Sequence, residues 1–325
     1  MSITAFRPTG DDALVAVTEV DAPTPRPDEA LIAVEAFSVN RGEVLLLASG
    51  RQEPPGKDVA GRVLQAARDG SGPAAGTRVV AHIEHGGWAE QVGVPTIRLA
   101  VLPDEVPSEV AATLPLAGLT ALRLLRAAGG IAGRRLLLTG ASGGVGHYLV
   151  ELAAGIGAKV TAVTATPQRG ERLLALGADA VVAAVEDAEG PFDVVIESVG
   201  GDVFGQALLK LRRAGLMLWY GQASLEPARA DFFAVGQGPV DVTVRSLWYW
   251  TEADRDGEDL ATLVDLVAAG HLHPEIGEIA DWAETPRLLA AVRERQVRGN
   301  AVLTVPPVIS GGSPRLEQAV RASAA

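Results

Sequence analysis

The feature that most constrains this chain is a strand–turn–helix pattern at residues 135–154. The apolar run Leu136–Leu138 is typical of a buried strand, and apolar residues recur at helical spacing from Tyr148 onward. The glycine-rich turn between them lets the backbone approach a pyrophosphate, and the N–H groups at the helix start attract that anion. The pattern predicts a nucleotide-binding βαβ unit. The predicted cofactor-binding residues of the turn are Ser142, Gly143, Gly144, Val145 and Gly146.

The glycine spacing Gly140-x-x-Gly143-x-x-Gly146 is a variant of the usual dinucleotide fingerprint and is weak by itself. Its context strengthens it, because strand and helix patterns alternate through the rest of this region. Strands are predicted at 135–140, 159–164, 179–184, 192–197, 215–221 and 241–247. Helices are predicted at 144–155, 168–176 and 202–213. This alternation predicts an α/β fold with a doubly wound parallel sheet of the Rossmann type.

Residues 1–115 have a different rhythm, with short β runs separated by proline and glycine turns, which predicts a barrel-like β domain. Helices are expected at 258–269 and 284–294, and a last strand at 301–305. We expect the C-terminal segment to return to the first domain. The predicted organisation is therefore a substrate domain of residues 1–115 and 271–325 and a dinucleotide-binding domain of residues 116–270.

Composition excludes several function classes. The formal net charge of −12 disfavours nucleic acid and anionic membranes as partners, because both require a basic surface. The chain has no cysteine, so it has no disulfide, no thiolate zinc site and no cysteine nucleophile. The first residues lack the pattern of a secretory signal, and no apolar run reaches the ~20 residues of a membrane span. We expect a cytoplasmic protein.

A series of motifs, taken in order, resembles the medium-chain dehydrogenase/reductase superfamily, and in particular its zinc-free quinone oxidoreductase branch, similar to zeta-crystallin. The motifs are Ser38-Val-Asn40-Arg41, Pro55-Gly-Lys-Asp58-Val-Ala-Gly61, Gly86-Gly-Trp-Ala-Glu90, Gly118-Leu-Thr120-Ala121, Thr139-Gly-Ala-Ser-Gly-Gly-Val-Gly146, Leu176-Gly-Ala-Asp179, Asp193-Val-Val-Ile-Glu-Ser-Val-Gly200 and Arg298-Gly-Asn300. The resemblance covers roughly residues 1–305. It implies a GroES-like β domain, a Rossmann domain, a homodimer, and NADPH-dependent reduction of quinones or α,β-unsaturated carbonyls.

The resemblance also implies the absence of zinc. Zinc-bearing relatives carry Cys where Asn40 stands and Gly-His-Glu where Gly56-Lys57-Asp58 stands. His82 and His85 form an H-x-x-H pattern in the β-rich region, and since a strand places residues three apart on opposite faces, the pair is poorly disposed to share a metal. We therefore predict no metal site and reject an alcohol dehydrogenase mechanism, which needs a metal to polarise the hydroxyl.

The end of the second Rossmann strand indicates the cofactor. NAD enzymes usually place an acid there to bind the ribose 2′-hydroxyl. In this chain residues 163–170 contain no acid, and the first one after the strand is Glu171. Thr164, Thr166 and Arg169 are instead candidates to bind a 2′-phosphate, Arg169 through charge-assisted hydrogen bonds. We predict NADPH as the cofactor; the alternative is that Arg169 is an ordinary solvated helix residue.

The resemblance implies further cofactor contacts, and a plain turn or strand-end role is the alternative for each. These residues are Thr120, Val199, Gly200, Gly221, Gln222 and Asn300. The catalytic candidates are Asn40, whose alternative role is to cap a turn, and Arg41, whose alternative is a surface charge. The reaction is hydride transfer to an electron-poor carbon, with negative charge growing on the carbonyl oxygen.

One departure from the family affects the mechanism. Relatives commonly carry a Tyr after the Asn motif, but residues 43–55 contain none, so the sequence does not identify the proton donor and solvent is one candidate. The aromatic run Trp248-Tyr-Trp250 and Phe232-Phe233 are expected to pack in a core or interface or to line the substrate cleft. Two alternatives to a quinone or enone reductase remain: an enoyl-thioester reductase, and an NADPH-binding protein without catalytic activity.

Overall fold

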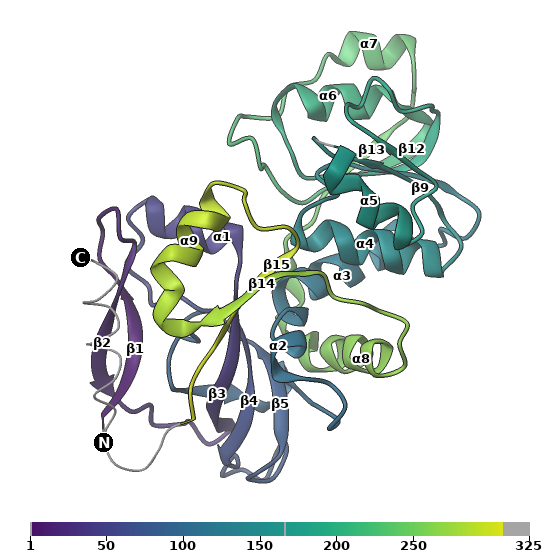
Figure 1. Cartoon of the computed structure of the whole chain (residues 1–325). Coiled ribbons are helices and arrows are strands. Elements are labelled where there is room, and N and C mark those ends of the chain that lie inside the picture. Colours follow the sequence, from purple (N-terminus) through teal and green to yellow (C-terminus); the bar gives the residue numbers. More distant parts are fainter. Residues whose placement is uncertain (1, 166, 308–325) are drawn as a thin grey trace. The chain divides into compact units, whose positions relative to one another are not determined.

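The structure, a computed structural model, describes residues 2–165 and 167–307 of the 325-residue chain and divides into two compact units (Figure 1). The first unit comprises the described residues of Met1–Leu119, Glu252–Gly270 and Pro274–Ala325. The second comprises those of Thr120–Thr251 and His271–His273. The predicted cofactor residue Thr166 and the tail 308–325 lie outside the described residues.

The first unit is built mainly from strands. Its strands are β1 (Ser2–Pro8), β2 (Val15–Asp21), β3 (Glu29–Val39), β4 (Asp58–Gln65), β5 (Arg78–His82), β6 (Gln91–Pro95), β7 (Leu99–Val101), β14 (Ile276–Asp281) and β15 (Asn300–Thr304). A seven-stranded sheet runs in the order β14-β15-β3-β4-β5-β7, with β6 also paired to β3, while β1 and β2 form an antiparallel pair. The C-terminal strand β15 thus pairs with β3 near the start of the chain.

Short helices accompany these strands. They are α1 (Arg41–Ala48), η1 (Thr96–Arg98), α2 (Ser108–Ala111), η2 (Leu114–Gly118), α8 (Asp256–Ala268), η4 (Trp282–Glu284) and α9 (Thr285–Arg293).

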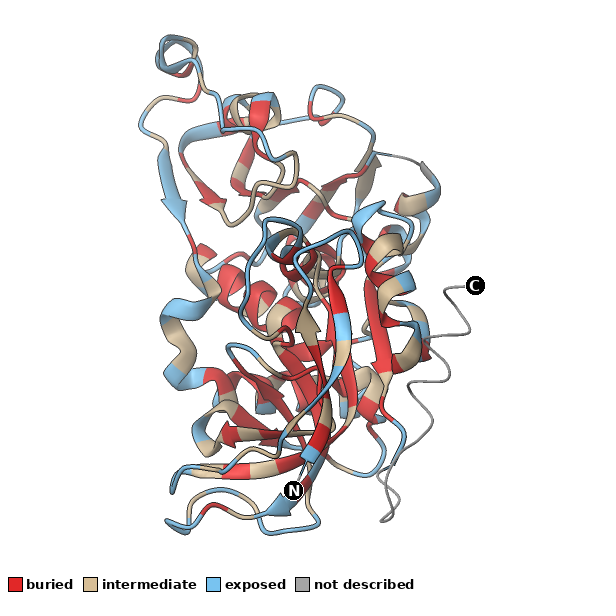
Figure 2. Ribbon diagram, turned by 90° about the vertical axis from the view of Figure 1, so that its left-hand side faces the viewer, coloured by how far each residue is buried: buried red, intermediate tan, exposed pale blue. Residues whose placement is uncertain are grey.

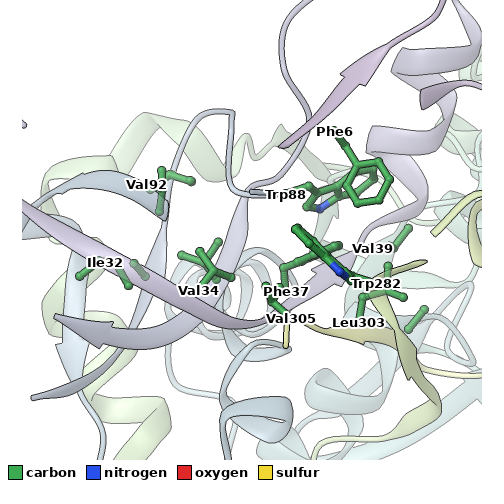
Figure 3. Packing of buried hydrophobic residues seen from close by; sticks show 14 of the residues in the cluster. Phe6, Ile32, Val34, Phe37, Val39, Trp88, Val92, Trp282, Leu303 and Val305 are labelled. Atoms are coloured by element: carbon green, nitrogen blue, oxygen red, sulfur yellow. The ribbon is translucent and has the colours of Figure 1, made fainter. Parts of the chain in front are cut away.

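The core of the first unit forms around the long strand β3. Ile32 and Val34 of this strand are buried and alternate with less buried residues, and Phe37, beyond the register shift at Val34–Ala36, is buried as well (Figure 3). The Phe37 and Trp88 rings stack with centroids 5.6 Å apart, and Trp88 Nε1 donates to the Ser38 carbonyl at 3.2 Å. This packing holds the β3 residues that precede Asn40 in a rigid setting.

The second unit contains a six-stranded parallel sheet in the order β10-β9-β8-β11-β12-β13. Its strands are β8 (Arg135–Leu138), β9 (Lys159–Val163), β10 (Ala180–Val182), β11 (Phe192–Glu197), β12 (Leu211–Trp219) and β13 (Thr243–Ser246). Its helices are α3 (Leu119–Ala128), α4 (Gly144–Gly155), α5 (Pro167–Ala175), α6 (Gly201–Leu209) and α7 (Phe232–Gln237), and η3 (Tyr249–Arg255) crosses the boundary between the units. The predicted doubly wound Rossmann fold is confirmed. Its topological switch point, where ligands bind in such sheets, lies between β8 and β11.

In each unit the central strands are buried and the polar faces of the helices are exposed (Figure 2). The predicted Rossmann domain, residues 116–270, includes helix α8, but in the structure this helix belongs to the first unit. Its apolar face, including Leu260 and Leu263, is buried, and Asp256 pairs with His82 of β5 at 2.8 Å. A helical pattern alone does not reveal which sheet receives that face. Within the described ranges, we find no helix with the length and apolar character needed to cross a lipid bilayer.

Candidate functional site

The predicted site residues divide between the two units. The turn after β8 carries the glycine motif in the second unit. Gly146 is required by close packing, since a Cβ there would lie 2.2 Å from the Ala141 carbonyl oxygen. Gly143 is the N-cap of α4 and is exposed, and no side chain among the described residues caps the helix. The helix therefore begins with backbone N–H groups available to an anion.

The neighbouring strand β9 ends at a second predicted contact. The Thr164 side chain is buried, and its Oγ1 has no hydrogen-bond partner among the described residues. Thr164 lies against Gly170, the residue after the half-buried Arg169 on α5. No acid occupies this strand end, as the sequence indicates. Thr166, the third residue predicted to bind the 2′-phosphate, lies outside the described part of the chain.

On the other side of β8, the turns after β11 and β12 lie side by side. The N–H groups of Ala223 and Ser224 donate to the carbonyls of Ser198 and Val199, at 2.8 and 2.9 Å. Gly200 has a φ of +77°, and a Cβ there would lie 2.7 Å from Gln222 Cγ, so only glycine fits this position. The structure thus brings four predicted residues to the carboxyl edge of the sheet: Val199, Gly200, Gly221 and Gln222.

These features fit a dinucleotide. The predicted diphosphate site is the start of α4 at the switch point, which no described side chain caps. At the adjacent strand end lies the buried Thr164 hydroxyl, which has no hydrogen-bond partner in the described part of the chain. Buried polar atoms are almost always hydrogen-bonded, so such an atom at a strand end indicates a position kept for a ligand. Thr120, by contrast, is buried near the start of α3, away from these turns in the sequence.

In the first unit, Asn40 is the N-cap of α1 and lies between two buried carboxylates. Asn40 Nδ2 donates to Asp58 Oδ2 at 2.6 Å and to Glu43 Oε2 at 3.1 Å. Ser38 Oγ and the Leu116 N–H also donate to Asp58, and the Gly56 N–H donates to Glu43. Asn40 thus stands at the N-cap position of α1, and its Nδ2 is already engaged by the two acids.

The surroundings change the acidity of this cluster. Burial, followed by the nearby charge of Asp58, raises the pKa of Glu43 to about 7. Burial also raises the pKa of Asp58, although the nearby imidazole of His82 opposes this shift. By the resemblance given above, Asn40 and Asp58 stand where zinc-bearing relatives are expected to carry metal ligands. The described residues contain no group of three or more His, Cys, Asp or Glu side chains that could hold a metal ion.

Two other predicted residues of the first unit occupy different settings. Arg41 follows Asn40 and is half-buried; burial and the guanidinium of Arg295 lower its pKa. Asn300 is buried, and its Nδ2 donates to the Glu275 carbonyl at 3.0 Å, which fixes the start of β15. The two histidines of the H-x-x-H pattern separate, with His82 buried against Asp256 and His85 exposed.

The aromatic residues divide similarly. Trp248 packs edge-on against Trp219 and stacks with Trp250, with centroids 5.6 and 4.9 Å apart. Phe232 and Phe233 on α7 are 70% and 86% exposed, so these rings do not belong to the core of the second unit. Their predicted choice between an interface and a substrate cleft stays a prediction.

Two buried acids, Glu43 and Glu197, are not among the residues predicted from the sequence. Glu43 stands three residues after Asn40, the spacing of a capping box, and this spacing is a signal that could have identified it. Glu197 is the last residue of the apolar strand β11 and points to a role at the strand end. An acid that ends a buried strand beside a glycine turn is also visible in a sequence.

Comparisons with known proteins agree with this geometry. Residues 144–268 match the family described as zinc-binding dehydrogenase. The chain is 36% identical over 212 residues to the chloroplast envelope quinone oxidoreductase homolog of Arabidopsis thaliana, which covers 57% of this chain and 64% of that protein. It is 27% identical to the quinone oxidoreductase of Salmonella typhimurium, with 92% and 98% covered. The chain belongs to the zinc-free quinone oxidoreductase branch of the medium-chain dehydrogenase/reductase superfamily.

Two further similarities are to a structure that contains NADPH and to part of a polyketide synthase. The mycobacterial protein Rv1454c, solved in complex with NADPH, superposes with a TM-score of 0.83 at 25% identity, over 93% of this chain and 99% of that one. The chain is also 31% identical to a part of the polyketide synthase GfsB of Streptomyces halstedii, covering 86% of this chain and 5% of that protein. This member of the branch therefore spans less than two thirds of the chloroplast and polyketide synthase relatives it matches.

Proposed function

We propose that the protein is a zinc-independent, NADPH-dependent oxidoreductase that transfers hydride to a quinone or to the C=C bond of an α,β-unsaturated carbonyl. The observation that carries this proposal is the anion seat at the start of α4, at the switch point of a parallel sheet. The names of the plant and Salmonella relatives support quinones as acceptors. A homodimer in the cytoplasm accompanies the proposal, and sedimentation of the purified protein would test the dimer.

NADPH, when bound, supplies the hydride. The chain's own contribution is to bind the dinucleotide, to exclude water and to stabilise the negative charge on the acceptor oxygen. Asn40 does not provide the hydrogen bond to this oxygen through Nδ2, because that group already donates to Asp58 and Glu43. The adjacent guanidinium of Arg41 is the better candidate, and we assign Asn40 the task of holding the start of α1. Water supplies the proton.

The direct test of the proposal is the substitution Gly143→Ala. A Cβ at Gly143 approaches no atom closer than 3.4 Å, so the fold should tolerate it. The methyl group would stand in the diphosphate seat, and we expect the Kd for NADPH to rise at least ~10-fold while Tm stays within ~2 °C. Gly155→Ala, at the other end of α4 and with no atom within 4 Å of its Cβ, is the matched control. Equal NADPH affinity in the two variants would contradict the proposed seat.

The preference for NADPH over NADH rests on Arg169. We expect Arg169→Ala to weaken NADPH binding about 10- to 100-fold, the value of a charge-assisted hydrogen bond, and to leave NADH binding nearly unchanged. Titration calorimetry with both cofactors measures the difference. Arg172→Ala on the same helix serves as the control, since Arg172 lies one turn further along α5. An equal loss for both cofactors would show that Arg169 does not read the 2′-phosphate.

The substrate class is tested by NADPH oxidation with three acceptors: 9,10-phenanthrenequinone, a small enone, and the N-acetylcysteamine thioester of crotonate. Turnover of the quinone or the enone supports the proposal. Turnover of the thioester alone would favour an enoyl-thioester reductase, the second candidate, which the similarity to part of a polyketide synthase supports. Tight NADPH binding without turnover of any acceptor would indicate a catalytically silent protein.

A further inference from the structure

Glu197 is a fully buried acid at the switch point of the Rossmann sheet. It ends β11 directly after Val194, Val195 and Ile196, which are fully buried as well. An ionisable group in such a place is costly unless hydrogen bonds compensate for the lost water. Burial accordingly raises the pKa of the Glu197 carboxyl.

One oxygen of this carboxyl group is fully used. Oε1 accepts hydrogen bonds from the N–H groups of Val199 and Gly200, at 2.6 and 3.0 Å, and from Thr139 Oγ1 at 3.3 Å. Thr139 follows β8, so this oxygen links the ends of the two strands on either side of the switch point. It shapes the turn that is predicted to contact the cofactor.

The other oxygen has no such role. Oε2 is buried and has no hydrogen-bond partner among the described residues. The neighbouring groups do not satisfy it: Ser198 Oγ donates to the Thr139 carbonyl at 3.3 Å, and the Tyr220 hydroxyl is hydrogen-bonded to Ser198. Within the described chain, no Lys, Arg or His forms an ion pair with Glu197. Tyr220 is the titratable neighbour, and burial raises the pKa of its phenol to about 12, so it stays uncharged.

The sheet order indicates which part of a dinucleotide would meet this oxygen. Thr164 and Arg169, proposed to bind the 2′-phosphate of the adenosine half, follow β9 on one side of β8. The diphosphate seat follows β8 itself, and β11 lies on the opposite side. The nicotinamide half then extends over β11, and it carries hydrogen-bond donors in its ribose hydroxyls and its carboxamide.

We propose that Glu197 is a positioning residue of the cofactor site, whose Oε2 accepts a hydrogen bond from a hydroxyl or amide donor of the nicotinamide half. This inference rests on the proposed function. In this proposal the two oxygens have different roles. Oε1 fixes the turn at residues 198–200 through its hydrogen bonds, and Oε2 binds the cofactor that lies beside this turn.

The substitution Glu197→Gln tests the inference. The glutamine oxygen can keep the three hydrogen bonds that Oε1 accepts. The amide N–H₂ group then replaces Oε2, and since it donates rather than accepts, it cannot bind the hydroxyl or amide donor of the cofactor. We expect the Kd for NADPH to rise about 10- to 100-fold, as for a lost hydrogen bond to a charged group. The Kd for 2′,5′-ADP, which lacks the nicotinamide half, should change less than ~2-fold. Glu189→Gln removes the same charge at an exposed position and is the control.

The same titrations identify which group of the cofactor donates the hydrogen bond to Oε2, and they also contain the results that would contradict the proposal. If the carboxamide donates, the penalty of Glu197→Gln disappears with the 3-acetylpyridine analogue of the reduced cofactor; if a ribose hydroxyl donates, it persists. Equal losses for NADPH and 2′,5′-ADP, or no loss for either, overturn the inference. If the Gln variant does not fold, Glu197→Asp, which keeps the charge and withdraws both oxygens, should show the same difference between the two ligands. A wild-type protein that does not bind NADPH would instead refute the proposed function.

Discussion

The two units of this protein each bury a polar cluster, and the clusters differ in how completely they are satisfied. In the first unit, every carboxylate oxygen of Glu43 and Asp58 accepts at least one hydrogen bond, and Asn40 bridges the two groups. In the second unit, Thr164 Oγ1 and Glu197 Oε2 are buried without a partner among the described residues. Both clusters include residues that directly follow or end strands of a central sheet.

This difference separates a structural role from a binding role. A satisfied buried network stabilises one arrangement of the chain, and the loss of one member leaves its partners without hydrogen bonds. An unsatisfied buried acceptor costs stability in the free protein and has value only when a ligand supplies the missing donor. The comparison therefore predicts opposite responses to mutation in the two units.

The largest effect is expected for Asp58→Ala. This change removes the acceptor of Ser38, Asn40 and the Leu116 N–H, all of which stay buried or half-buried. We expect the free energy of unfolding to fall by about 3 kcal/mol or more, measured by urea denaturation. Asp12→Ala, at an exposed position, is the control and should cost less than ~0.5 kcal/mol. If Asp58→Ala lowered the free energy of unfolding by as little as Asp12→Ala, the cluster in the first unit would not have the structural role we assign to it.

The next effect is a pH dependence caused by Glu43. Its pKa is about 7 in the folded protein, against an ordinary value of 4.5 for a solvated glutamate, so the folded state binds the proton more tightly than the unfolded chain. The resulting stabilisation is complete below pH ~4.5 and is lost as pH rises to ~7, by on the order of 2–3 kcal/mol. Denaturation curves between pH 5 and 8 should show this loss in the wild type and a smaller one in Glu43→Gln. The exposed Glu105→Gln variant should show the same change of unfolding free energy with pH as the wild type. If all three proteins showed the same change, a group other than Glu43 would cause the pH dependence.

The smallest effect on stability is expected for Thr164→Val, which keeps the shape of the side chain and removes a hydroxyl without a partner among the described residues. The free energy of unfolding should change by less than ~0.5 kcal/mol, while the Kd for NADPH should rise about 10-fold, because the hydroxyl is proposed to bind the 2′-phosphate. Thr161→Val on the same strand, β9, is the control for β propensity. A marked loss of stability without a change in NADPH affinity would show that Thr164 has a structural role, as Asp58 has in the first unit.

Helix α4 of the second unit begins and ends at the predicted residues 144 and 155. The helix predicted at 202–213 is too long, because α6 ends at Leu209 and residues 211–213 open strand β12. Local chemistry explains the agreement for α4, because glycine turns and apolar periodicity act over a few residues. The assignment of α8 depended instead on a distant partner, as the buried pair between His82 and Asp256 joins residues 174 positions apart. Such a pairing leaves no mark in the local pattern.

The sequence by itself determined the class of fold, the glycine turn and the lack of an acid after β9, since each depends on residue types at short spacing. Only the tertiary structure decided which polar groups are satisfied. Asn40 is held by two buried acids, one in the next turn of helix and one on the neighbouring strand β4. Glu197 has one oxygen that accepts hydrogen bonds and one without a partner among residues 2–165 and 167–307. Hydrogen bonding depends on directions and distances of about 3 Å between strands far apart in the chain, and these are set when the sheets assemble.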